Sequence, residues 1–131
     1  MSKDPYETFA WLGISDFGKD PRRVTQVVGL EPSESYVKGD PWRGEIKRFS
    51  SAWILNSPAD KTESLEKVLG KLFEILRTKE AGVIEAGQRF SAEIGVAAYF
   101  RESLPILNLS SVLVKQIADY GCSLDIDTYQ L

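Results

Sequence analysis

Two segments near the C-terminus, residues 90–100 and 122–129, constrain the fold most, because apolar and polar residues alternate along both. A period of two is typical of a β-strand with one covered and one more polar face. Such strands do not suit a sheet that is covered by helices on both sides. The apolar faces hold Phe90, Ala92, Ile94, Val96 and Ala98 in the first segment, and Cys122, Leu124 and Ile126 in the second.

Two further strands are predicted in residues 6–14 and 48–56, both of which have apolar side chains on both faces. The first helix is expected between Asp20 and Gly29. Asp20 can cap its start, Pro21 suits the first turn, and Gly29 can adopt the left-handed conformation that ends it.

The longest helix is predicted from Asp60 to about Thr78, with Asp60 and Glu63 as a capping box. The third is predicted from a cap at Ser110 to Gly121. Residues 82–89 have the glycine spacing of a phosphate-binding loop but lack its Lys and Ser/Thr. They are therefore interpreted as a plain loop between helix and strand.

This order predicts one α+β domain over residues 1–131. The expected architecture is a two-layer sandwich with about four strands in a mixed or antiparallel sheet and three helices mainly on one face. Residues 31–44 are rich in Pro, Gly, Ser and Asp and are expected to form a structured loop, with short strands possible within it.

Composition excludes several classes of partner. A net charge of −3 and a pI near 5.0 disfavour nucleic acid, which needs a clustered positive surface. No run of about 18 apolar residues suggests a membrane helix. Residues 1–5 lack the apolar centre of a signal peptide, and a single cysteine fits a reducing compartment, so we expect a cytoplasmic protein.

The sequence contains no histidine. This rules out Ser-His and Cys-His nucleophile pairs, histidine bases and most zinc or iron sites. Cys122 follows a helix-ending glycine at an inward strand position and is expected to be an inert buried thiol. We assign no catalytic residue, no metal ligand and no cofactor. Whether the protein is an enzyme stays open, with a non-enzymatic role favoured.

The strongest candidate site is the polar face of the predicted sheet. Asp125 and Asp127 share a strand face, and Glu93 and Glu7 could join them. These carboxylates could bind Mg²⁺ or Ca²⁺, share a proton as an acid/base dyad, or form an ordinary solvated face. The same face is expected to carry Trp53, Tyr99 and Tyr129, with Trp11 a further candidate.

Those aromatic residues are interpreted either as core or as an exposed binding surface. The loop after the first helix adds Lys38, Asp40 and Arg43 as ligand-binding candidates, with solvated charges as the alternative.

The chain also resembles the bacterial domain-of-unknown-function family 4279. The residues that carry the resemblance are Val24-Thr25, Gly29-Leu30, Pro32, Lys38-Gly39-Asp40, Trp53, Ser57, Leu109-Ser110, Ala118, Gly121 and Leu124-Asp125-Ile126-Asp127 with Tyr129. The resemblance spans nearly the whole chain. It implies a stand-alone bacterial domain and transfers no catalytic residue.

Three functions stay open. The first is a non-enzymatic protein-binding domain, conceivably an immunity protein that neutralises a toxin. The second is a small-ligand or divalent-metal-binding domain that uses Asp125, Asp127 and Glu93. The third is homo-oligomerisation through the open sheet face. The expected partners are thus another protein or a second copy.

Overall fold

A five-stranded mixed sheet forms one layer of the molecule in the computed structural model, which describes residues 5–131. The segment in which a signal peptide would begin, residues 1–4, lies outside the described residues. Within residues 5–131 the strand order is β2-β5-β1-β6-β7, in which β6 and β7 pair in parallel and the other neighbours pair antiparallel. The strands are β1 (Tyr6–Ser15), β2 (Glu34–Tyr36), β5 (Ala52–Asn56), β6 (Ser91–Phe100) and β7 (Ser123–Gln130).

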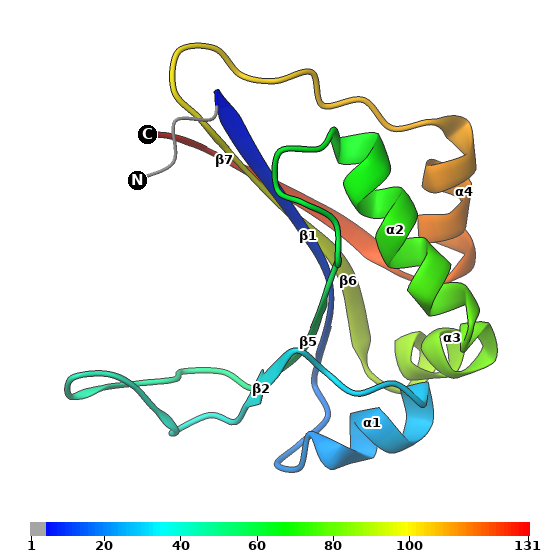
Figure 1. Cartoon of the computed structure of the whole chain (residues 1–131). Coiled ribbons are helices and arrows are strands. Elements are labelled where there is room, and N and C mark those ends of the chain that lie inside the picture. Colours follow the sequence, from blue (N-terminus) through cyan, green and yellow to red (C-terminus); the bar gives the residue numbers. More distant parts are fainter. Residues whose placement is uncertain (1–4) are drawn as a thin grey trace.

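Four helices form the other layer and cover one face of the sheet (Figure 1). They are α1 (Arg22–Val28), α2 (Leu65–Arg77), α3 (Glu80–Arg89) and α4 (Ser111–Asp119). The predicted α+β class and one-sided helix layer are therefore confirmed, while the numbers of strands and helices differ from the prediction. No helix among residues 5–131 has the length and apolar character needed to cross a membrane.

The core lies between the sheet and α2. Leu12, Ile14 and Ile94 of the sheet are at most 1% exposed. They belong to the same core cluster as the apolar stripe of α2, which is at most 2% exposed. The apolar residues of α2 recur every three or four positions, so they lie on one face of the helix. The buried residues of that stripe are Leu65, Val68, Leu69, Leu72, Phe73 and Leu76.

Local signals set most helix ends. The Asp20 carboxylate accepts the Arg22 backbone N–H at 3.0 Å, and Gly29, at φ +83°, donates its N–H to the Thr25 carbonyl. At the start of α4, Ser110 accepts the Leu113 N–H at 3.3 Å, as predicted.

The predicted start of α2 is corrected. Ser64 caps this helix by accepting the Lys67 N–H, and α2 begins at Leu65. The Asp60 carboxylate instead accepts two hydrogen bonds from Thr62, so it stabilises the preceding turn.

Residues 82–89, predicted as a loop, belong to helix α3. A Cβ on Gly82 would lie 2.4 Å from the Val28 carbonyl oxygen, so the glycine allows α1 and α3 to pack closely. Gly87 approaches the Tyr120 carbonyl oxygen in the same way, where a Cβ would lie 3.1 Å away. The glycines that suggested a loop are thus helix-packing positions.

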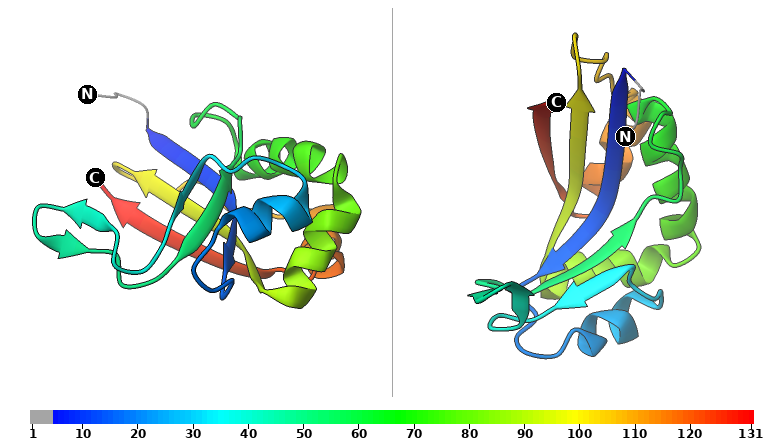
Figure 2. Two further views of the ribbon diagram at one scale, coloured as in Figure 1. Left: turned by 90° about the horizontal axis from the view of Figure 1, so that it is seen from below. Right: turned by 60° about the vertical axis from the view of Figure 1, so that its left-hand side comes forward.

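The sheet curves so that its uncovered face is concave (Figures 1 and 2). A small hairpin of β3 (Pro41–Arg43) and β4 (Ile46–Lys47) extends from one end of the sheet on this same side. The short strands considered possible in the first loop are therefore present. The concave face and the hairpin are two surfaces that the helices leave free. Strand β7 at the sheet edge is not covered as predicted, because Leu124 and Ile126 of its apolar face are 39% and 38% exposed.

Candidate functional site

The concave face of the sheet, called the open face below, is built from alternate residues of β1, β6 and β7. Strand pairing places Glu7 beside Tyr99, Tyr99 beside Tyr129, and Ala97 beside Asp127. Because neighbouring paired residues point to the same side of a sheet, these side chains share one surface. Its members are Glu7, Phe9 and Trp11 of β1; Glu93, Gly95, Ala97 and Tyr99 of β6; and Asp125, Asp127 and Tyr129 of β7.

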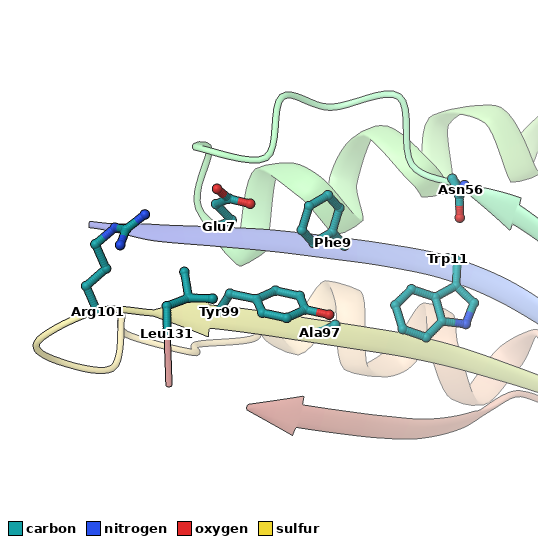
Figure 3. A pocket seen from close by; sticks show the side chains of 8 residues that line it. All are labelled: Glu7, Phe9, Trp11, Asn56, Ala97, Tyr99, Arg101 and Leu131. Carbon is teal, nitrogen blue, oxygen red and sulfur yellow. The ribbon is translucent and has the colours of Figure 1, made fainter. Parts of the chain in front are cut away.

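A hollow of about 620 Å³ lies on this face (Figure 3). Its walls are mostly aromatic and apolar, and Glu7 and Arg101 lie together at one end. The lining residues are Glu7, Phe9, Trp11, Asn56, Ala97, Tyr99, Arg101 and Leu131.

Small residues on β6 make room for the aromatic rings. A Cβ on Gly95 would lie 2.3 Å from Cε2 of Trp11, so the indole rests directly on the Gly95 backbone. Phe9 meets Tyr99 edge to face, with ring centroids 5.9 Å apart, and Tyr99 stacks on Tyr129 at 5.0 Å. The rings therefore support one another as a continuous aromatic floor.

Part of this floor is open to solvent. Phe9 is 41% exposed and Tyr129 is 47% exposed. An aromatic cluster that stays exposed in a folded domain is typical of an interaction surface, because isolated folding alone would favour its burial.

Three carboxylates flank the aromatic floor on the β6–β7 side. Glu93, Asp125 and Asp127 form no ion pair within residues 5–131, whereas Glu7 pairs with Lys61 at 3.4 Å. Burial, and then the charges of Asp125 and Asp127, raise the pKa of Glu93 above its usual value. The Asp127 charge likewise raises the pKa of the Tyr129 phenol.

No group of three or more His, Cys, Asp or Glu side chains in the described part of the chain is placed to hold a metal ion. Cys122 is partly buried, and burial raises the pKa of its thiol to about 11, which leaves it protonated at neutral pH.

The predicted site residues lie in three places: the open face, the core and the projecting hairpin. Glu93, Tyr99, Asp125, Asp127 and Tyr129 are brought together on the open face, as their strand positions predicted. Trp53 is not with them: it is 0% exposed, it faces the helices, and its Nε1–H donates to Thr25 Oγ1 at 3.0 Å. The prediction that Trp53 lies on the polar face is therefore wrong, because its side chain belongs to the core.

The loop candidates lie on the projecting hairpin, which with its flanking residues 37–50 is called the arm. The Asp40 carboxylate accepts the Val37 N–H at 2.9 Å, so it shapes the turn into β3. The Lys38 backbone N–H donates to Ser51 Oγ. The Arg43 guanidinium lies 4.7 Å from the Trp42 ring centroid.

Sequence reasoning missed several members of both surfaces. Phe9 shares a strand face with Trp11 but is absent from the predicted site residues. The available signal was the alternation along β1, which places Phe9 on the face opposite to buried Ala10. Trp42 and Phe49 of the arm are 44% and 84% exposed. No periodic signal in so short a hairpin distinguishes an exposed aromatic residue from a buried one.

The comparisons with known proteins show the family and nothing more specific. The family model described as Domain of unknown function (DUF4279) matches residues 6–131, so the chain belongs to this family. No curated protein and no solved structure matches the chain.

Proposed function

We propose that this DUF4279 domain is a non-enzymatic protein-binding domain and that the open face is its binding surface. The observation that carries the proposal is a solvent-exposed aromatic floor on a concave sheet face, flanked by carboxylates that have no ion-pair partner among the described residues. Aromatic residues are enriched at the centres of protein interfaces, where they bury a large apolar area.

The charge of the face indicates the kind of partner. Glu93, Asp125 and Asp127 lie along one side of the aromatic floor, and their mutual repulsion contributes to the raised pKa of Glu93. A cationic segment would relieve this repulsion on binding and would be attracted from a distance. The expected partner therefore presents Lys or Arg beside apolar side chains on a convex surface or extended segment. An immunity-like role, in which this face covers a cationic site of a toxin, is one form of this proposal.

The available side chains support a binding role over catalysis. The chain has no histidine, and the Cys122 thiol stays protonated at neutral pH. The open face therefore offers carboxylates and phenols but no paired nucleophile and base.

A small apolar ligand is the second candidate, because a hollow of about 620 Å³ has the size of a small-molecule site. Such a ligand would raise the melting temperature of the purified protein by mass action. The double substitution D125K/D127K would leave that shift unchanged, because neither aspartate lines the hollow.

The protein-binding proposal is tested by affinity capture with three baits from cells of the source organism: wild type, D125K/D127K, and the control E74K/E85K. The control makes the same charge change at exposed positions on helices α2 and α3. We expect wild type and control to retain the same partner, and the open-face variant to bind it at least about tenfold more weakly. Equal retention by all three baits, or none by any, would contradict the proposal.

A further inference from the structure

The arm, residues 37–50, is the second exposed surface of the molecule, and its chemistry is opposite to that of the open face. It contains four basic and two acidic residues, a net charge of +2, while the rest of the chain carries −5. Three of its apolar side chains are exposed: Trp42 at 44%, Ile46 at 57% and Phe49 at 84%. A small projecting hairpin with this much exposed apolar surface is typical of a segment that is covered in an assembly.

Interactions within the arm and with strand β2 keep the arm in shape. The Arg48 guanidinium lies 3.8 Å from the Tyr36 ring centroid and 4.9 Å from that of Trp42, and it pairs with Glu34 at 3.3 Å. Arg43 lies over the same Trp42 ring. The backbone closes the hairpin through hydrogen bonds from Gly39 N–H to the Arg48 carbonyl and from Arg48 N–H to the Asp40 carbonyl. The arm is thus preorganised to present Trp42 with cationic groups beside it.

We infer that the arm of one copy docks on the open face of a second copy, which gives a symmetric dimer with two reciprocal arm contacts. This inference rests on the proposed function of the open face and names a second copy of this chain as an occupant. The argument is charge and shape complementarity within one molecule. The arm combines exposed aromatic and basic side chains. The open face combines a concave aromatic floor with carboxylates that have no ion-pair partner within residues 5–131.

The position of the arm fits this arrangement. It extends from the edge of the sheet on the concave side, away from the helix layer (Figures 1 and 2). A two-fold axis that brings two concave faces together therefore places each arm toward the partner's open face, as an isologous interface requires. The strongly acidic remainder of the chain makes an anionic lipid surface a poor alternative partner for the arm.

The test is light scattering coupled to size exclusion over a concentration series with three variants: R43E/K47E in the arm, D125K/D127K on the open face, and the two combined. Arg43 and Lys47 are exposed residues of adjacent arm strands. We expect the wild type to form a dimer. R43E/K47E and D125K/D127K should each raise the dissociation constant of the dimer at least tenfold, and the variant that combines all four substitutions should dimerise again. Circular dichroism checks that each variant is folded.

A wild-type protein that stays monomeric at all concentrations overturns the arm inference, and so does failure of the combined variant to recover. A dimer weakened by D125K/D127K but not by R43E/K47E also overturns it, while leaving the open face as a protein-binding surface. The opposite outcome is an intact wild-type dimer with no other protein captured by any of the three baits. It would support the arm inference and contradict the proposed function.

Discussion

At the scale of single residues, Glu93 distinguishes the open face from an ordinary solvated strand surface. Its carboxylate lies beside the aromatic floor and near Asp125 and Asp127, without a cation in the described residues to balance the three charges. Burial and these two neighbours disfavour the charged form and raise the pKa of Glu93. A carboxylate in this environment reduces the stability of the free protein, and a cationic partner would relieve the charge repulsion when it binds.

This leads to a pH-dependent prediction for E93Q. Because the pKa of Glu93 is higher in the folded than in the unfolded state, folding becomes less favourable as pH rises from the ordinary glutamate pKa of 4.5 through the raised value. E93Q should therefore melt above wild type at pH 7, with no difference below about pH 4. Solvent screening keeps the gain in the free energy of unfolding below about 1 kcal/mol, which corresponds to a rise in melting temperature of about 4 °C.

Calorimetric melting curves at pH 4 and pH 7 measure this difference, with E31Q as a control for the loss of an exposed carboxylate. If E93Q destabilises the protein at pH 7, the carboxylate has a stabilising partner and the account of the acidic flank is incorrect.

At the scale of elements, the sequence predicted the four longer strands and three helices because their periodicity is strong, although β5 begins at Ala52 and not at residue 48. The alternation in residues 90–100 correctly assigned Ile94 and Val96 to the covered face. The pattern Ala52-Trp53-Ile54-Leu55 placed Trp53 and Leu55 on one face, but both faces are apolar, so nothing local shows which one the helices cover. Tertiary packing determines which face is covered, and for this reason Trp53 was predicted in the site but lies in the core.

Helix α3 was missed for a related reason. Gly82 and Gly87 suggest a loop by propensity, yet both lie where another backbone approaches the helix, too closely for a side chain at Gly82 and tightly at Gly87. The gain from that close packing is a tertiary effect and is not visible in local sequence.

The close packing predicts opposite effects for two glycine substitutions. G82A should destabilise the protein by about 1–3 kcal/mol, because its Cβ would meet the Val28 and Val27 carbonyl oxygens at 2.4 and 2.6 Å. G70A lies in helix α2, where a new Cβ would have no neighbour within 4 Å, and it should stabilise the protein by about 0.5–1 kcal/mol. Urea unfolding of the two variants measures both. A stabilising G82A would show that α1 and α3 do not pack as described.

At the scale of the whole molecule, the one-sided helix layer is the feature from which the proposals follow. It buries the apolar face of the sheet against α2 and leaves the other face concave, aromatic and flanked by acids. The arm adds a basic, aromatic projection on the same side. The acidic strand positions in this site could be predicted from alternation alone, whereas the hollow and the arm depend on sheet curvature and on a short hairpin without a periodic pattern.

The central claim, that the open face is the binding surface, is tested most directly by site-specific photocrosslinking in cells of the source organism. One protein carries a photoreactive phenylalanine analogue in place of Tyr129 on the open face, and the other carries it in place of Val112, which is 65% exposed on α4. We predict a discrete crosslinked protein, either a second copy or another partner, from position 129 and none from position 112. Equal crosslinking from both positions, or crosslinking from position 112 alone, would contradict the claim.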